Sequence, residues 1–242
     1  RRGGAERVTS MVAGFLQERH DCTLVLFDAS SPDFPFGGEV LSLDLPEAHD
    51  LSWAARARLT VRAFRRLARI KRERCFDVLL SSLEPANIPN ALLPRRRGTR
   101  TALWVHGHKG YVHQQTWRRR ATDGLMRVAY PRADAVIAVS HGVRDSLIER
   151  CRLRPERVHV VYNPLDVEAI RAASAQALTP EHAAIFDGPV VLTSGRLTIQ
   201  KGQWHLLRAF RRVREQLPEA RLVLLGDGEL REYLGRLAAG LG

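Results

Sequence analysis

Two cations in the second half of the sequence have the types and the spacing needed to neutralise a diphosphate. Arg196 and Lys201 lie five residues apart in LTSGRLTIQKG, where an apolar strand should end and the next helix begin. Arginine can bind phosphate oxygens through its bidentate fork, and lysine adds a mobile point charge. The N-terminus of the following helix would contribute unpaired N–H groups and the positive end of its dipole. The segment therefore predicts a diphosphate site, with Gly195 turning the chain into it.

Two glycine pairs could bring the backbone close to the same kind of ligand. In GDGEL, Gly226 and Gly228 permit a tight turn after the next apolar run, and Glu229 is expected to begin a helix. Gly3 and Gly4 open the first helix of the chain, where the backbone can approach an anion. A simple turn is the alternative for this second pair. It is not the G-x-G-x-x-G fingerprint, which argues against a nicotinamide-dependent dehydrogenase.

A histidine is expected at the edge of the sheet where ligands bind. His106 follows the apolar run TALWV, and α/β sheets place ligands at the C-terminal ends of such strands. It could bond a sugar hydroxyl or a carbonyl or phosphate oxygen, although a purely structural histidine is the alternative. His108 and His113 follow it, but no cysteine or carboxylate at zinc spacing accompanies them. We therefore expect neither a metal nor another cofactor.

The pair Ser140–His141 could suggest a hydrolase. A nucleophile elbow requires G-x-S-x-G, whereas the sequence here is V-S-H-G. We expect Ser140 to cap the N-terminus of the helix that follows.

These residues must be positioned by alternating strands and helices. We expect strands at 22–27, 76–81, 101–106, 135–140, 158–163, 190–194 and 221–226. Helices are expected at 5–19, 53–74 and 201–216, and from 229 onward. The strands are apolar on both faces, which is typical of parallel sheets covered by helices. The alternation predicts a doubly wound α/β fold.

The sequence predicts two domains. The first is expected at 1–165 and the second at 189–242, joined by a linker at 166–188 that has no strand pattern and ends in Asp-Gly-Pro. The second domain has about two β/α units, roughly half of what a Rossmann-like domain needs, and no strand precedes the first helix. We therefore expect a fragment that is open at both ends, with the second domain truncated.

The composition suggests an anionic partner. The chain has 38 basic and 26 acidic residues among 242, a formal charge of +12. Nucleic acid, a membrane surface or a phosphorylated substrate would suit this charge, and solvated helix faces would also explain it. The amphipathic helix at 56–74 could lie on an anionic membrane, or its apolar face could pack on the sheet with its arginines in solvent. The three scattered cysteines suit a reducing cytosol, and no apolar run has the length of a membrane span.

Five segments resemble the retaining family-4 glycosyltransferases, which have the GT-B fold of two Rossmann-like domains. They are RGGAER, VSHGVRDSLI, VVYNPLDVEAI, SGRLTIQKGQWHLLRAF and LLGDGEL, in this order. The likeness runs through nearly the whole chain, and is with bacterial enzymes that add hexose or N-acetylhexosamine units to lipid-linked or surface glycans. It implies an acceptor-side domain first and a donor-binding domain second.

The resemblance also implies roles for individual residues. His106, Arg196 and Lys201 are the catalytic candidates: the histidine near the donor sugar, and the two cations at the departing nucleotide diphosphate. Candidate donor-binding residues are Gly3, Gly4, Gly195, Arg196, Lys201, Gly228 and Glu229. The lack of a D-x-D motif fits a metal-independent mechanism.

The sequence departs from the family pattern in one respect. The family has a Glu-x7-Glu pair late in the second domain, whereas the match here is Glu39 with Glu47, on the wrong side of the linker. We expect the true pair to lie beyond this sequence, so that the chain alone would be inactive.

We therefore predict transfer of a sugar, from a UDP-sugar or a related donor, to a glycan or lipid-linked acceptor with retention, in the synthesis of cell-envelope polysaccharide or glycoconjugates. Loops near 30–40, 84–90 and 106–116 would select the acceptor. The protein would be cytoplasmic, with peripheral binding to the inner face of the plasma membrane and no nucleic-acid partner. The alternatives are a GT-B synthase or phosphorylase acting on soluble sugars, and a basic nucleic-acid-binding module.

Overall fold

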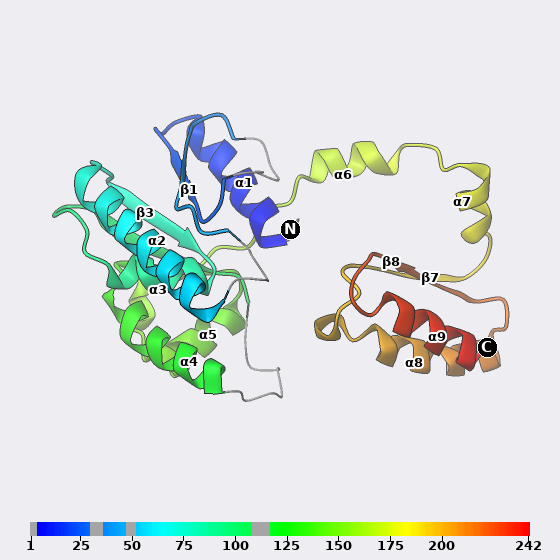
Figure 1. Ribbon diagram of the computed structural model, residues 1–242. Helices are drawn as coiled ribbons and strands as arrows, with labels where there is room; N and C mark the ends of the chain where they lie inside the picture. The colour runs from blue at the N-terminus through cyan, green and yellow to red at the C-terminus, as the bar shows by residue number, and fades with distance from the viewer. Residues whose placement is uncertain (1–3, 30–35, 47–51, 108–116) are drawn as a thin grey trace. The chain divides into compact units, whose positions relative to one another are not determined.

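A computed structural model describes residues 4–29, 36–46, 52–107 and 117–242. The chain divides into two compact units, Arg1–Leu165 and Asp166–Gly242. Both are built from helices and parallel strands, so the predicted α/β class is confirmed (Figure 1).

The first unit contains a four-stranded parallel sheet and a separate parallel pair. The four strands, in spatial order, are β3 (Val78–Ser82), β4 (Arg100–Val105), β5 (Ala135–Ala138) and β6 (Val158–Val160). The separate pair is β1 (Thr23–Leu26) with β2 (Glu39–Ser42). The helices are α1 (Gly4–Gln17), α2 (Trp53–Glu73), α3 (Glu84–Leu92), α4 (Trp117–Ala129) and α5 (His141–Cys151). Short 3-10 turns, η2 (Tyr130–Arg132) and η3 (Pro155–Arg157), precede β5 and β6.

The core of this unit surrounds β4. Leu103, Trp104 and Val105 follow one another along this strand and are at most 3% exposed. Because successive side chains of a strand point to opposite faces, both faces of β4 are covered. This agrees with the apolar pattern of the sequence and identifies β4 as a central strand of a layered sheet.

The helix at α5 begins as its sequence predicts. Ser140 is the N-cap residue, and its Oγ accepts a hydrogen bond from Val143 N at 3.3 Å. The serine therefore serves as a helix cap, which confirms the prediction made against a nucleophile elbow.

Two segments that we expected to be irregular form regular elements. Residues 84–90, expected as an acceptor loop, belong to α3, and part of the expected loop at 30–40 forms β2. Pro85 in the first turn of α3 suits a helix start, and Asn87 and Asn90 resemble turn residues in sequence but are buried here. Residues 30–35 of the expected loop at 30–40, and residues 108–116 of the expected loop at 106–116, lie outside the described residues.

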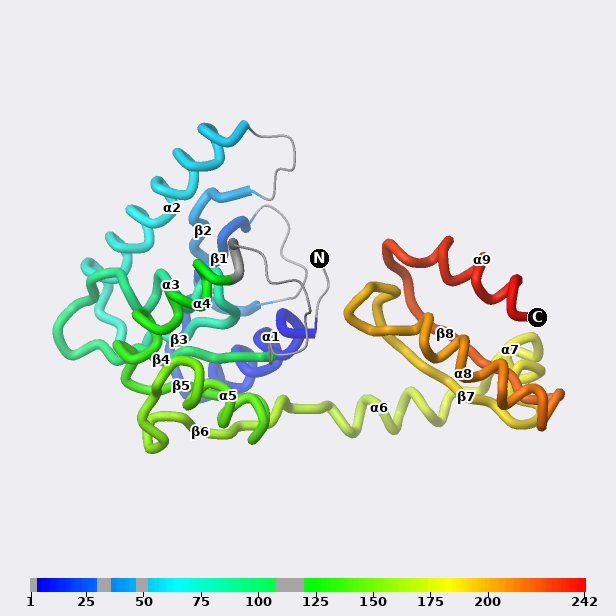
Figure 2. Tube along the Cα trace, turned by 90° about the horizontal axis from the view of Figure 1, so that it is seen from below, coloured from blue at the N-terminus to red at the C-terminus, as the bar shows by residue number. Residues whose placement is uncertain are grey.

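The second unit has a smaller core. It contains α6 (Val167–Ser174), α7 (Pro180–Ile185), the parallel pair β7 (Val190–Ser194) and β8 (Arg221–Leu225), the 3-10 turn η4 (Ile199–Lys201), α8 (Gln203–Gln216) and α9 (Arg231–Leu241). Helices α8 and α9 lie along the same side of the strand pair (Figures 1 and 2). Val191 and Leu192 of β7 are 44% and 49% exposed, so the expectation that both faces of this strand are buried is wrong. Helices on one side cannot cover both faces of two strands.

A buried lysine on α2 caps the end of α3. Lys71 is 1% exposed, and its Nζ donates hydrogen bonds to Asn90 O and, at 3.1 Å, to Leu93 O. Carbonyls at the end of a helix lack partners within it, and a cation suits the negative end of the helix dipole. Burial, followed by the charge of Arg95, lowers the pKa of Lys71 to about 8.

Replacing Lys71 by Met should change how stability depends on pH. Between about pH 8 and the usual lysine pKa of 10.5, the unfolded chain keeps a proton that the folded chain has lost, so rising pH favours folding through this group. We expect the wild type to gain roughly 3 kcal/mol over Lys71→Met between pH 7.5 and 10.5, measured by urea unfolding. A constant difference in stability between the two proteins over this pH range would contradict the argument.

Candidate functional site

The carboxyl ends of β3 and β4 bring a serine and the expected histidine together. The strands are parallel and Ser82 pairs in register with Trp104, so both strands end at the same edge. Ser82 Oγ lies 2.9 Å from Nε2 of His106. The His106 ring is tilted by 39° against the ring of Trp104, with 4.5 Å between the ring centroids. Sequence reasoning did not identify Ser82. The only local signal was its place just after a predicted strand.

The first helix also reaches this edge. Gly4 begins α1, and Thr9 in the second turn lies with its Oγ1 3.3 Å from Ser82 Oγ. The Thr9 hydroxyl donates to Ala5 O at 2.8 Å. Gly3 lies outside the described residues. Glu6 occupies the first turn of α1, where its negative charge competes with any anion for the helix N-terminus, so the role of Gly4 at a diphosphate stays a prediction.

The surroundings of His106 favour its neutral form. The residue is half-buried, and desolvation lowers its pKa below 6.5 although the carboxylates of Glu6 and Glu84 act in the opposite direction. A neutral imidazole offers one donor and one acceptor nitrogen. Its Nδ1 is buried and has no hydrogen-bond partner among the described residues.

The turn between β3 and α3 is strained. Leu83 has a φ of +71°, a region that bulky residues rarely occupy. Its N–H donates to Trp104 O at 3.3 Å, and the same carbonyl accepts a hydrogen bond from Asn87 Nδ2 at 2.9 Å. These bonds hold the turn in place, and the turn places Glu84 at the start of α3. Strained backbone of this kind is often found at functional sites.

A small cavity of about 30 Å³ lies beside the end of β4. Its walls include Val105, Met126 and Leu147, and the ion pair between Asp123 and Arg150 (2.8 Å) lines it as well. A cavity of this volume has room for about two water molecules. It is too small for a sugar.

In the second unit, the loop that carries both cations contacts the loop after β8. The register of β7 and β8 pairs Ser194 with Leu225, so the two strands end together. Gly195 N donates to Leu225 O at 2.9 Å, and Leu197 N donates to Asp227 O at 2.9 Å. The two glycine-containing segments of the sequence thus form one structure at this edge.

The glycines of the second loop are required by this contact. A Cβ on Gly226 would lie 2.0 Å from Gly195 O, and a Cβ on Gly228 would lie 2.5 Å from Leu197 O. Such distances are sterically forbidden. Gly226 and Gly228 therefore serve the packing of loop against loop, whatever contact they make with a ligand.

Arg196 and Lys201 are exposed, and neither forms an ion pair with a carboxylate in the described part of the chain. The Lys201 stem passes over Gly195, where an added Cβ would lie 3.7 Å from Lys201 Cε. Both cations are followed by α8, a helix of 14 residues whose first turn offers N–H groups. This arrangement can bind an anion with two negative groups.

Gln203 holds the cation loop in place, a role that sequence reasoning did not identify. It is 4% exposed, and its Nε2 donates to Arg196 O at 3.0 Å. Its Oε1 is buried without a partner among the described residues. As the first residue of α8, it resembled an ordinary helix residue in sequence.

The expectation that Glu229 begins a helix is wrong. Glu229 is exposed in a turn, and α9 starts at Arg231. The reason is that Leu230 N donates to Leu197 O at 3.0 Å, which ties this residue to the neighbouring loop instead of to a helical turn.

The described residues contain no group of three or more His, Cys, Asp or Glu side chains that could hold a metal ion. His108 and His113 lie outside them. Independence of metals and other cofactors stays a prediction.

Both parts of the chain match known families of glycosyltransferases in sequence. The family model described as Glycosyltransferase Family 4 matches residues 2–169, and the one described as Glycosyl transferases group 1 matches residues 175–242. An N-acetylgalactosamine-N,N'-diacetylbacillosaminyl-diphospho-undecaprenol 4-alpha-N-acetylgalactosaminyltransferase of Campylobacter jejuni is 26% identical, over 96% of this chain and 61% of that enzyme. An alpha-maltose-1-phosphate synthase of Mycolicibacterium smegmatis is 39% identical, over 43% of this chain and 27% of that enzyme.

Among solved structures, HepE of Anabaena in complex with UDP-glucose has a TM-score of 0.63 and 20% identity, over 100% of this chain and 64% of that one. This likeness confirms the GT-B fold expected from the sequence. The chain spans less than two thirds of the length of each of these three proteins.

Substitutions at the glycines test the contact between the two loops of the second unit. Gly226→Ala and Gly228→Ala should each lower stability by about 2 kcal/mol or more, since the backbone must move to avoid the clash. Gly235→Ala in α9, where an added Cβ meets nothing within 4 Å, should raise stability by up to about 1 kcal/mol. Thermal unfolding followed by circular dichroism measures all three. Gly226→Ala as stable as the wild type would show that the loops do not touch.

Proposed function

This chain belongs to glycosyltransferase family 4, and we propose that it forms part of an enzyme that transfers a sugar from a nucleotide diphosphate sugar to a glycan or lipid-linked acceptor. The observation that carries the proposal is the pair Arg196 and Lys201, exposed and without carboxylate partners in the described chain, on a loop braced by Gln203. Cations held ready for an anion, beside a helix N-terminus, suit a diphosphate.

In the proposed reaction, the bond between the anomeric carbon and the diphosphate breaks, and the negative charge on the leaving group increases. Arg196 and Lys201 would stabilise that charge electrostatically, together with the N–H groups that begin α8. The acceptor hydroxyl forms the new bond, and its proton goes to the departing phosphate or to solvent. Retention at the anomeric carbon, and the absence of a metal, are parts of this proposal that follow from the family resemblance.

UDP as the donor nucleotide is supported by the solved structure of HepE, which is described in complex with UDP-glucose. A lipid-linked acceptor is supported by the Campylobacter relative, whose name specifies a diphospho-undecaprenol substrate. The likeness to an alpha-maltose-1-phosphate synthase supports the second candidate, a synthase acting on soluble sugars.

Transfer by the intact protein should depend on both cations. We expect Arg196→Ala and Lys201→Ala each to reduce kcat by about 100-fold or more, since stabilisation of a developing anion is lost. Turnover would be measured with UDP-glucose and UDP-N-acetylglucosamine on a diphospho-undecaprenol-linked acceptor, and the anomeric configuration of the product read by NMR. Arg212→Ala, an exposed arginine of α8, is the control.

Two results would contradict this scheme. Unchanged turnover in both alanine variants would remove the roles assigned to the cations. Transfer to glucose 1-phosphate, with none to the lipid-linked acceptor, would instead favour the soluble-sugar synthase.

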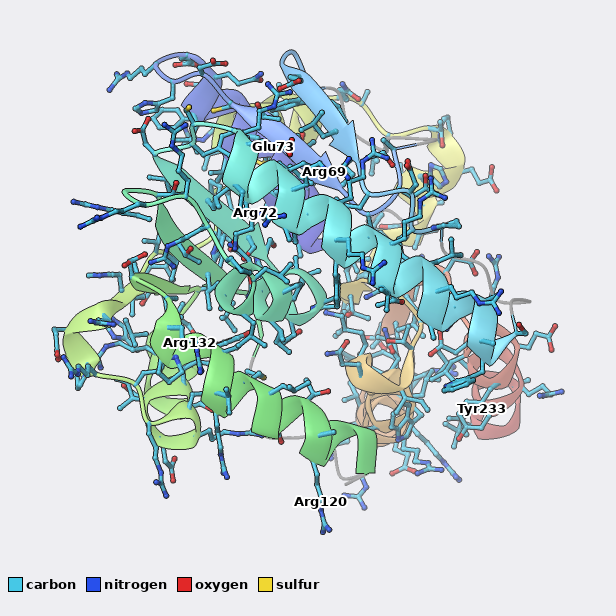
Figure 3. All side chains as sticks on the ribbon, turned by 60° about the vertical axis from the view of Figure 1, so that its left-hand side comes forward. Arg69, Arg72, Glu73, Arg120, Arg132 and Tyr233 are labelled. Carbon is cyan, nitrogen blue, oxygen red and sulfur yellow. The ribbon has the colours of Figure 1, made fainter. Side chains whose placement is uncertain are left out.

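The proposal includes peripheral binding to the cytoplasmic face of the plasma membrane. Of the helices in the described part of the chain, none has the length and apolar composition to span a bilayer. One face of α2 carries an arginine row whose members recur every three or four residues and are all exposed. Two of its members, Arg69 and Arg72, are labelled on α2 in Figure 3. The row consists of Arg58, Arg62, Arg65, Arg69 and Arg72. It spans about 20 Å along the helix.

This arginine row has little internal compensation. Within the described residues, the ion pair that a member of the row forms is that of Arg69 with Glu73, at 4.0 Å, and both side chains of this pair are exposed. The opposite face of α2 is anchored in the first unit by Ala63 and Lys71, which are at most 1% exposed. A row of cations on a firmly packed helix suits an anionic lipid surface.

Binding to vesicles tests the arginine row. The wild type should co-sediment with vesicles of phosphatidylglycerol and phosphatidylcholine in equal parts, and not with phosphatidylcholine alone. Arg62→Glu/Arg65→Glu/Arg69→Glu should weaken this binding by about 100-fold or more, since each cation near the surface contributes about 1 kcal/mol. Arg208→Glu/Arg211→Glu/Arg212→Glu changes the charge equally on α8 and should bind nearly as the wild type does. Equal losses in both variants, or tighter binding to duplex DNA than to vesicles, would contradict the membrane proposal.

A further inference from the structure

The hydroxyl hydrogens next to His106 can be assigned by counting donors. The Thr9 hydroxyl has one hydrogen, and Ala5 O, 2.8 Å away, can only accept it. With the Thr9 hydrogen on Ala5 O, the contact between Thr9 Oγ1 and Ser82 Oγ, 3.3 Å apart, is a hydrogen bond only if Ser82 donates. The Ser82 hydrogen is then used, and its Oγ must accept at 2.9 Å from a proton on His106 Nε2. The three bonds form a single series that runs from the imidazole to a backbone carbonyl.

If these hydrogen bonds ran in the opposite direction, fewer buried donors would have an acceptor. If Ser82 donated to His106 Nε2, Thr9 would have to turn its hydrogen from Ala5 O, 2.8 Å away, to Ser82 Oγ at 3.3 Å, and the imidazole proton would lie on Nδ1. That nitrogen is buried and has no acceptor among the described residues. Buried N–H groups without an acceptor are rare in proteins, rarer than acceptors with spare capacity. The count of satisfied donors therefore favours a proton on Nε2.

A second buried nitrogen lies next to this imidazole. Trp104 is 3% exposed, and its Nε1, which can only donate, also has no partner in the described part of the chain. Trp104 and His106 are alternate residues along one strand direction and therefore share a face, with their rings 4.5 Å apart. With the proton on Nε2, the two rings leave one donor, Trp104 Nε1, and one acceptor, His106 Nδ1, without a partner in the described residues. A hydroxyl group can pair with either atom, since it both donates and accepts.

We propose that Thr9 and Ser82 are positioning residues that hold the His106 proton on Nε2, so that Nδ1 remains free to accept a hydrogen bond from a hydroxyl group. That this hydroxyl belongs to a bound sugar rests on the proposed function. The tautomer itself does not, since it follows from contacts within the first unit. Helix α1 then has a defined role, because its second turn fixes which atom of the imidazole faces the ligand.

The tautomer can be read by NMR of the intact protein with ¹⁵N-labelled histidine at pH 7.5. This pH lies above the pKa of His106, which burial lowers from 6.5. The chain has nine histidines, so the signals of His106 are identified as those that are lost in His106→Gln. We expect the nitrogen shift of a protonated Nε2 and an unprotonated Nδ1. A proton on Nδ1, or equal populations of the two tautomers, would overturn the proposal.

Substitution of Thr9 provides the sharper test. In Thr9→Val the Ser82 hydrogen loses its acceptor and can turn toward Nε2, so the imidazole proton should move to Nδ1. Thr60→Val is the matched control, because Thr60 makes the same bond to the carbonyl four residues earlier, at 2.9 Å to Arg56 O, on the exposed surface of α2. It should leave the His106 signals unchanged. An unchanged tautomer in Thr9→Val would overturn the role assigned to Thr9.

Ser82 variants complete the experiment. Ser82→Ala should produce a mixture of tautomers, whereas Ser82→Thr, which keeps the hydroxyl, should retain the proton on Nε2. Retention of the wild-type tautomer in Ser82→Ala would contradict the proposal. The measurement uses no donor sugar, so a failed transfer assay does not affect it. Equally, a wrong tautomer would leave the roles of Arg196 and Lys201 untouched.

Discussion

The buried amide of Asn87 holds the edge of the sheet at which His106 lies. Its side chain is fully buried, with Oδ1 accepting from Ser81 Oγ at 2.7 Å and Nδ2 donating to Trp104 O at 2.9 Å and to Tyr130 Oη at 3.4 Å. One residue thereby joins β3, β4 and η2. A buried polar group without partners is costly, so these bonds allow few other arrangements of the three elements. The positions of Ser82 and His106, at the carboxyl ends of the two strands, depend on this network.

In the second unit, backbone hydrogen bonds join the two loops at the edge of the strand pair, and the Gln203 side chain braces one of these loops. Its two loops are joined by hydrogen bonds from Gly195 N to Leu225 O and from Leu197 N to Asp227 O, and the absence of side chains at Gly226 and Gly228 lets them approach. Side chains from this contact are therefore free to face outward, and Arg196 is one of them. A backbone-built loop suits a site that must present cations to solvent, because the loop does not need them for its own stability.

The two units offer chemically different sites. The first presents a neutral imidazole near the carboxylates of Glu6 and Glu84, surroundings that favour hydroxyl groups over phosphates. The second presents Arg196 and Lys201, which favour phosphates over neutral hydroxyls. A nucleotide sugar contains both kinds of group.

The sequence by itself determined the α/β class, most of the strands of both units and the loop with its two cations. These depend on apolar periodicity, residue type and short spacing, which are local properties of the chain. The tertiary structure alone decided that α3 is a helix, because the amides of Asn87 and Asn90 find buried partners on β3 and β4 that no local pattern specifies. It also decided the hydrogen bonds that lead to His106, since Thr9 and Ser82 are 73 residues apart and meet only through packing. Such contacts arise from the burial of whole elements, so the residue types that make them carry no local signature.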